Sequence, residues 1–174
     1  KIDSYLKAYE CDTTSAFGGI IACNYKVDKT VAKEISKKFF EVVVANGFES
    51  SALNILKRKK NLRLIDSSLL KELNFEQNTS IMNNFLSQTS DTGKFKKEDF
   101  KIVSKVRPSK ETLNNLLFTF NVCRCVKSNA IVISQNNATI GIGSGQPSRL
   151  DSCKIAVRKM KKLRKINIKE KVVA

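Results

Sequence analysis

The chain has 174 residues, of which 41% are hydrophobic, and no segment is long and apolar enough to cross a membrane. Its formal net charge is +16, but nine of its 32 Lys and Arg residues fall between residues 154 and 174, and Lys outnumbers Arg 25 to 7. Because Arg is preferred for phosphate and base contacts, neither a nucleic-acid nor a membrane partner is expected, and the chain is interpreted as a cytoplasmic globular protein without a signal peptide.

The first third of the chain alternates between helix and strand patterns. Residues 2–9 predict a short helix, and the apolar run at residues 19–23 predicts a buried strand. Asp28 is a typical N-cap, from which a second helix is expected to run to about Phe39.

The same alternation continues beyond this helix. Three successive valines within residues 41–45 (EVVVA) predict a strand that is covered on both faces. A helix over residues 50–59 and a strand over residues 62–65 follow. This order of elements indicates an α/β layer.

The middle of the chain gives a weaker signal. Residues 81–88 predict one strand, and the polar, turn-rich segment 87–94 is typical of a connection between structural units. We therefore expect two lobes, one over residues 1–92 and one over residues 93–174 that ends in a basic tail.

The second half begins with a predicted strand over residues 101–106, after which Ser109 caps a helix that is expected to run to about Cys125. Two apolar stripes on this helix predict burial on two sides. They are formed by Leu113, Leu116, Leu117 and Phe120 and by Phe118, Val122 and Cys125. Asn136 and Asn137 then predict the turn of a hairpin between residues 129–134 and 138–142.

Residues 139–149 (TIGIGSGQPSR) describe a strand, a glycine loop and the start of a last helix, with Ser148 as its N-cap. Three glycines in this stretch let a backbone approach a ligand closely, and Arg149 lies where the helix dipole disfavours a cation, which suggests an anionic ligand. An ordinary turn with a solvated arginine explains these residues equally well. The last helix is expected to bury Cys153, Ala156, Met160 and Leu163 and to end near residue 163.

Histidine is absent, which excludes Ser-His-Asp and Cys-His nucleophiles and His-ligated metals. The cysteines are odd in number, widely spaced and without a C-x-x-C pair, so they indicate neither a disulfide framework nor a zinc site. They are Cys11, Cys23, Cys123, Cys125 and Cys153. Buried, reduced thiols and no metal are expected.

Three blocks of the sequence together resemble one known family. VKSNAIVIS (residues 126–134), the glycine loop (139–149) and DTTSAFGGIIACN (12–24) closely resemble the transformylase half of the bifunctional AICAR formyltransferase/IMP cyclohydrolase family, in the family's order and at about its spacing. Weaker similarity covers residues 33–65. The resemblance implies two cytidine-deaminase-like α/β lobes without zinc, with mixed sheets flanked by helices.

The resemblance also implies an activity. Family members transfer a formyl group from the co-substrate 10-formyltetrahydrofolate to the amine of AICAR in purine (IMP) biosynthesis, need no metal for this step, and act as homodimers. The implied catalytic residues are Asn129 and Lys127, and the implied substrate-binding residues are Phe17, Gly18, Glu41, Gln146 and Arg149. For Phe17, Glu41 and Asn129 the alternatives are a core residue, a solvated carboxylate and a turn residue.

The sequence also departs from the family pattern. The family's catalytic Lys-His pair and its terminal segment fall outside this chain, and the cyclohydrolase half is missing. Within the match, Pro147 and Val157 replace residues of other types. Since neither Asn129 nor Lys127 accepts a proton readily at neutral pH, we expect a fragment that is inactive by itself. A degraded gene, a noncatalytic nucleotide-binding remnant and a basic nucleic-acid-binding module are the alternatives.

Overall fold

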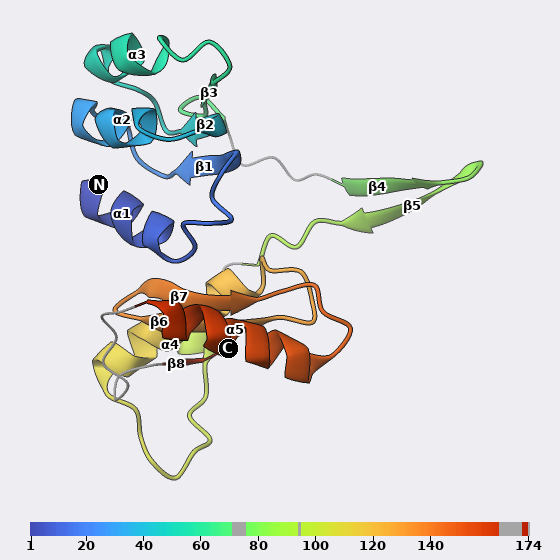
Figure 1. Cartoon of the computed structure of the whole chain (residues 1–174). Helices are drawn as coiled ribbons and strands as arrows, with labels where there is room; N and C mark the ends of the chain where they lie inside the picture. The colour runs from blue at the N-terminus through green and yellow to red at the C-terminus, as the bar shows by residue number, and fades with distance from the viewer. Residues whose placement is uncertain (71–75, 94, 164–171, 174) are drawn as a thin grey trace.

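A computed structural model describes residues 1–70, 76–93, 95–163 and 172–173 of the chain. Two α/β layers lie one above the other in Figure 1, and a hairpin projects away from both. We call them the N-terminal layer (residues 1–66), the C-terminal layer (residues 97–163 with 172–173) and the arm (residues 76–89).

The N-terminal layer contains three strands that pair in parallel in the order β1-β2-β3. Each strand is joined to the next by a helix, and α2 packs against α3. Its elements are α1 (Ile2–Glu10), β1 (Gly19–Cys23), α2 (Lys29–Ser36), β2 (Phe40–Ala45), α3 (Ser50–Leu56) and β3 (Arg63–Asp66). The expected α/β layer is therefore confirmed.

The N-cap of α2 is confirmed, because the Asp28 carboxylate accepts hydrogen bonds from the backbone N–H groups of Thr30 and Val31. The helix ends at Ser36 and not near Phe39. Tight turns that join Lys37 N–H to Glu34 and Lys38 N–H to Ile35 close it, as is common at helix ends. The chain then enters β2 with a buried Phe40.

The strands of this layer are less covered than the sequence predicts. In β2, Phe40, Val43 and Ala45 are buried while Glu41 is exposed. In β1 the side chain of Ile20 is 71% exposed. One face of the sheet packs into a core that includes Val27, Val31, Ile35 and Leu56, so burial alternates along the strands. The predictions of full coverage were wrong for this reason.

The arm consists of β4 (Glu76–Ile81) and β5 (Asn84–Thr89), which pair antiparallel. The single strand predicted over residues 81–88 was wrong, because a turn lies inside it. Met82 adopts a positive φ of 51° there, a conformation that is rare for a residue other than glycine. Every residue of both strands is exposed.

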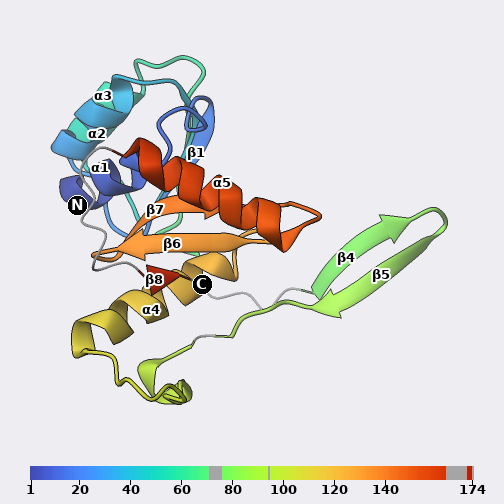
Figure 2. The same cartoon turned by 60° about the horizontal axis from the view of Figure 1, so that its bottom comes forward.

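The C-terminal layer is a sheet with a helix on each face. The sheet order is β7-β6-β8, all pairs being antiparallel, and α5 covers one face while α4 covers the other (Figure 2). Its elements are the short 3-10 helix η1 (Lys97–Asp99), α4 (Lys110–Cys123), β6 (Ile131–Gln135), β7 (Ala138–Gly143), α5 (Arg149–Lys162) and β8 (Val172–Val173). The chain therefore contains parallel and antiparallel sheets flanked by helices.

The strand predicted over residues 101–106 does not form. This segment is irregular, and the side chains of Ile102 and Val103 are 41% and 87% exposed. No other strand among the described residues lies beside it to supply hydrogen-bond partners. High β-propensity alone does not make a strand when nothing pairs with it.

Helix α4 begins after Ser109, whose hydroxyl accepts a hydrogen bond from Thr112 N–H as an N-cap should. Its fully buried side chains are polar, namely Asn115 and Thr119, and the predicted apolar stripes are only partly covered, with Phe120 exposed. The expectation of burial on two sides was wrong, because the leucine stripe faces the irregular segment before the helix and not a second sheet.

The predicted hairpin between β6 and β7 is confirmed. Asn136 and Asn137 have φ values of 51° and 52°, the left-handed conformation that a two-residue type I′ turn requires and that asparagine tolerates. Asn137 N–H also donates to the side-chain oxygen of Asn115 at 2.7 Å, which ties the turn to α4.

Two glycines of the predicted loop have a packing role. A Cβ at Gly141 would lie 2.3 Å from the carbonyl oxygen of Ala156, and one at Gly143 would lie 1.9 Å from that of Ser152. Both glycines therefore let α5 pack against β7, so the prediction that they face a ligand was wrong. Of the three glycines in the predicted loop, only Gly145 has a positive φ, of 65°, and it has open space around it.

Two further predictions need correction. The buried face of α5 contains Ser152 and Ala156, whereas Cys153 is exposed. All five cysteines are free, but Cys125 and Cys153 are exposed, so the expectation of buried thiols was wrong for these two. The basic tail after residue 163 falls mostly outside the described residues.

Candidate functional site

Asn129 connects the segment before β6 to the loop before α5. Its side-chain Nδ2 donates to the backbone carbonyls of Gln146, at 3.0 Å, and Pro147, at 2.9 Å. Its backbone N–H donates to the Gln146 carbonyl at 3.1 Å. Both N–H groups of the side-chain amide are thus occupied, and the side-chain oxygen of Asn129 is left as the group that can accept a hydrogen bond from a ligand.

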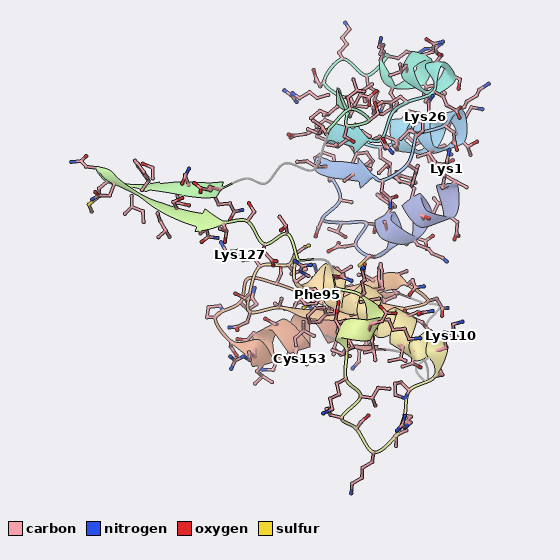
Figure 3. The ribbon with its side chains drawn as sticks, turned by 180° about the vertical axis from the view of Figure 1, so that it is seen from behind. Lys1, Lys26, Phe95, Lys110, Lys127 and Cys153 are labelled. Carbon is pink, nitrogen blue, oxygen red and sulfur yellow. The ribbon has the colours of Figure 1, made fainter. Side chains whose placement is uncertain are left out.

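Lys127 is held beside the same loop through its backbone. Its carbonyl accepts a hydrogen bond of 2.7 Å from Gly145 N–H, at the position where the positive φ of Gly145 turns the chain. The Lys127 side chain is exposed, and Figure 3 shows it near the base of the arm. The structure therefore brings Lys127, Asn129 and Gln146 together, as the sequence predicts.

A buried serine that the sequence analysis missed completes this arrangement. Ser152 Oγ donates to the carbonyl of Asn129 at 2.7 Å and is fully buried under Gly143. Its position one helical turn after the N-cap, next to the closely packed glycine, was the available signal. It fixes the carbonyl of Asn129 against the first turns of α5.

Arg149 is the first residue of α5 and its side chain is exposed. Within the described part of the chain it forms no ion pair, and Ser148 takes the N-cap position without a side-chain capping bond. Since Asn129 bonds to Pro147, two residues earlier, the backbone of Arg149 is within about 7 Å of that carbonyl. A cation and unsatisfied helix N–H groups therefore lie beside Asn129.

The remaining predicted residues form a second group, in the N-terminal layer. Gly18 has a φ of 69° and donates its N–H to the carbonyl of Phe39 at 3.1 Å. A Cβ at Gly18 would lie 3.8 Å from a carboxylate oxygen of Glu41, so these two residues are neighbours. The ring of Phe17, which is 78% exposed, lies 5.1 Å from that of Phe39.

A cavity of about 220 Å³ adjoins this second group. It is lined by residues from α1, from the turn before β1 and from the start of β2, among them Tyr9, Phe17 and Phe39. Because Phe17 is exposed, its role as a simple core residue is excluded. Glu41 forms no hydrogen bond with another of the described residues and is exposed on β2.

The two groups belong to different layers. The layers meet where α1 approaches β7 and where the Lys159 ammonium lies 2.7 Å from the Asp12 carboxylate. Lys159 is ten residues after Arg149 on α5, about 15 Å along the helix axis. No hydrogen bond, ion pair or ring contact joins the two groups in the described ranges.

The Asp12–Lys159 contact was also missed from sequence. Burial raises the pKa of the Asp12 carboxyl, but hydrogen bonds from Lys159 and from Ser15 outweigh it, and the pKa falls to about 2. Asp12 begins the segment that leads to Phe17, so the ion pair positions that segment against the C-terminal layer. Residues so distant in sequence give no local signal.

Among the residues whose placement is described, no three His, Cys, Asp or Glu side chains lie together in a way that could hold a metal ion. None of the helices in that same part of the chain has the length and apolar character needed to span a bilayer.

Comparisons with known proteins show which protein family the chain matches. A family model described as "AICARFT/IMPCHase bienzyme" matches residues 1–159. The chain is 40% identical over 158 residues to the bifunctional purine biosynthesis protein PurH of Lactobacillus acidophilus, covering 90% of this chain and 31% of that protein. It is 44% identical over 163 residues to PurH of Paracoccus denitrificans, and 44% identical over 159 residues to PurH of Neisseria gonorrhoeae, covering 91% of this chain and 30% of each relative. The chain thus spans about three tenths of the length of these relatives.

Proposed function

The chain belongs to the AICARFT/IMPCHase bienzyme family, and from this premise we propose that it is part of a purine-biosynthesis enzyme that transfers a formyl group from 10-formyltetrahydrofolate to the amine of AICAR. The observation that carries the proposal is the pair of hydrogen bonds from the Asn129 side chain to Gln146 and Pro147. They join two of the three sequence blocks that resemble the family, and this contact supports assigning both blocks to one site.

Asn129 is proposed to orient the reacting amine. That amine is a poor nucleophile, because its lone pair is conjugated with the imidazole and carboxamide of AICAR, so its orientation matters for the rate. With both Nδ2 protons held by backbone carbonyls, the side-chain oxygen of Asn129 has a fixed direction and can accept an N–H of the amine. Lys127 supplies a positive charge near the tetrahedral oxyanion.

Gln146 and Arg149 are proposed to bind the nucleotide. The loop before α5 ends in backbone N–H groups that the Ser148 hydroxyl leaves uncapped, and Arg149 adds a guanidinium at the same helix start. A phosphate or carboxamide oxygen of AICAR satisfies both sets of donors. Gly145, whose surroundings are open, leaves room for that approach.

The second group is proposed to contact the remaining substrate parts. Phe17 and Phe39 present an exposed aromatic surface on which a flat ring can stack, and Gly18 turns the chain beside them. Glu41, next to Gly18, is placed to accept hydrogen bonds from ribose hydroxyls. Nucleotide and folate would then lie between the two groups.

We further propose that the layers are partial lobes of cytidine-deaminase-like type, divided near residue 92. Two separate hydrophobic cores support the division. One is built from residues of the N-terminal layer such as Val31 and Val43, and the other contains Ile133, Ile140 and Ala156. No sheet crosses between the layers in the described residues.

The test is AICAR binding to the purified chain, measured by titration calorimetry. Arg149→Ala is expected to weaken binding by about ten- to a hundredfold, since a hydrogen bond to a charged group is worth roughly 1.5–3 kcal/mol. Arg158→Ala is the matched control, because Arg158 is exposed on the opposite side of the same helix. An unchanged dissociation constant for Arg149→Ala, or an equal loss in both variants, would contradict the proposal.

Formyl transfer by the same sample gives a second readout. Asn129 and Lys127 supply orientation and charge but no proton acceptor, so the chain by itself is expected to bind AICAR without turnover. Turnover above background would show that a proton acceptor exists within these residues and that the assigned roles are incomplete.

A further inference from the structure

The two groups of proposed substrate-binding residues lie in layers that have separate hydrophobic cores. One core is built around Val31 and Val43 of the N-terminal layer, and the other contains Ile133, Ile140 and Ala156 of the C-terminal layer. Two cavities, of about 500 Å³ and about 580 Å³, lie between α1 and β7, where the layers meet. Because apolar packing does not fill this space, the polar contacts that cross it have more influence on the relative position of the layers.

The ion pair between Asp12 and Lys159 is such a contact. The ammonium lies 2.7 Å from the carboxylate, at the short end of the range for a charge-assisted hydrogen bond, and Figure 2 shows the C-terminal end of α5 beside α1. Although burial raises the pKa of the Asp12 carboxyl, hydrogen bonds from Lys159 and Ser15 bring it down to about 2, so Asp12 is ionised at neutral pH. The pair is therefore fully formed under the conditions in which a substrate would bind.

On the N-terminal side, Asp12 also holds the segment that leads to Phe17 and Gly18. Its carboxylate accepts hydrogen bonds from Ser15, at 3.0 Å from the backbone N–H and at 2.8 Å from the hydroxyl. The N–H of Ala16 donates to the Asp12 carbonyl at 3.2 Å, which closes one helical turn. Because this compact turn joins them, Phe17 and Gly18 follow the position of Asp12.

On the C-terminal side, Lys159 is fixed relative to Arg149 because both residues belong to α5. Ten residues of helix separate them, which is about 15 Å along the axis. The helix packs closely on β7 at Gly141 and Gly143, so it does not move independently of its layer. The ion pair therefore helps to determine how far Phe17 lies from Arg149.

We propose that Asp12 and Lys159 are positioning residues for the substrate site, and that their ion pair sets the spacing between Arg149 and the second group of substrate-binding residues. Neither side chain has to touch the substrate. The inference rests on the proposed function, in which one AICAR molecule contacts Arg149 in one layer and Glu41 in the other. A ligand that bridges two layers binds tightly only when both are held at the matching distance, because each contact then strengthens the other.

The first experiment compares the AICAR affinity of variants of the 174-residue chain by titration calorimetry, at a temperature at which circular dichroism shows every variant to be folded. Asp12→Asn keeps an acceptor for Ser15 but loses the charge, and is expected to weaken binding at least about fivefold, the lower end of typical couplings between sites. Lys159→Met should do the same, whereas Lys159→Arg keeps the charge and should retain most of the affinity. Asp3→Asn removes the exposed pair with Lys7 on α1 and is the matched control.

A double variant separates positioning from general destabilisation. Arg149→Ala is expected to cost less affinity in the Asp12→Asn background than in the wild-type chain, because the ligand no longer contacts both layers at once. Inorganic phosphate is small enough to contact the start of α5 alone. Its affinity, followed by NMR at the Arg149 amide, is therefore expected to be the same with and without Asp12→Asn. Additive losses of AICAR affinity, or a parallel loss of phosphate affinity, would overturn the proposal.

A distance measurement tests the geometry without any ligand. Spin labels are attached to Cys153 on α5 and to an Asn54→Cys substitution on α3, both at exposed positions, in a Cys125→Ser background. Pulsed electron paramagnetic resonance then reports the spacing of the two layers. Asp12→Asn is expected to broaden the distribution of distances, and Asp3→Asn is expected to leave it unchanged.

The outcomes distinguish this inference from the proposed function. A distance distribution that Asp12→Asn does not broaden, or an AICAR affinity that falls with Arg149→Ala but not with Asp12→Asn, overturns this inference alone. A broadened distribution together with an AICAR affinity that Arg149→Ala leaves unchanged contradicts the proposed function instead. A wild-type chain that binds no AICAR overturns both.

Discussion

Asp12 and Lys159 form an ion pair of 2.7 Å although 147 residues separate them, and this pair joins the N-terminal layer to α5. Both side chains are only partly exposed, at 26% for Asp12 and 35% for Lys159. The contact is therefore screened less than a surface pair but more than a buried one.

Asp12→Asn is expected to lower the free energy of unfolding by about 1 kcal/mol at neutral pH, after allowance for solvent screening. The folded-state pKa of Asp12, about 2, lies below its usual value of 3.8, so the stabilisation is complete above the unfolded pKa and is lost as pH falls from about 4 to about 2. Urea unfolding at several pH values measures this. Asp3→Asn, which removes an exposed pair with Lys7, should show a smaller loss; a pH-independent difference for Asp12→Asn would contradict the assignment.

Thr119→Val is expected to destabilise the C-terminal layer by about 1–3 kcal/mol, because it leaves a buried hydroxyl unpaired. Thr119 Oγ1 donates to the Asn115 carbonyl at 2.6 Å and also shares a hydrogen bond with Ser134 Oγ. The Thr119→Val/Ser134→Ala double variant removes both hydroxyls and should recover part of the loss. Denaturant unfolding measures both single variants, Thr119→Val and Ser134→Ala, and the double variant. A double variant that loses the full sum of the single effects would argue against coupling.

Gly143→Ala is expected to cost about 3 kcal/mol or more, because the new Cβ would lie 1.9 Å from the Ser152 carbonyl oxygen and α5 would have to move. Gly145→Ala is the control, since that Cβ meets open space and the cost is the roughly 1 kcal/mol of a left-handed alanine. Thermal unfolding distinguishes them. Equal losses at both positions would mean that close packing of α5 on β7 is not what Gly143 provides.

Asn129→Asp is expected to loosen the loop before α5, because a carboxylate cannot donate to the carbonyls of Gln146 and Pro147. Amide hydrogen exchange at Gly145 and Gln146 should accelerate about tenfold, the equivalent of roughly 1.4 kcal/mol. Asn121→Asp, at a residue that donates to Leu117 on α4, provides the control and should leave the loop unchanged. Unaltered exchange in Asn129→Asp would show that the loop holds its shape without this side chain.

Local patterns predicted most of the elements correctly. The Asp28 cap, the Ser109 cap and the Asn136–Asn137 turn are each decided by a few adjacent residues, and the structure has all three. The strand over residues 101–106 was predicted by the same kind of pattern and was wrong. A strand depends on a neighbour for its hydrogen bonds, and the sequence of one segment does not say whether that neighbour exists.

In the candidate site, too, the sequence predicted some contacts and missed others. The block around Asn129 and the loop at Gln146 were predicted together from the resemblance, and hydrogen bonds do join them. The two glycines before the loop were assigned to a ligand, because a sequence shows that a backbone can be approached closely but not what approaches it. Here the approaching group is α5, at Ser152 and Ala156.

The pairing order of the strands has a consequence for how the chain folds. In the N-terminal layer each strand pairs with the next along the chain, so its contacts are local and close small loops, whereas the bonds that attach Asp12 to Lys159 close nearly the whole chain. We expect the N-terminal layer to acquire its structure first, both in refolding and during synthesis, and the C-terminal layer to join it afterwards. Pulse-labelled hydrogen exchange should then protect Val43 and Val44 before Ile133, and the reverse order would show that the layers do not assemble in this sequence.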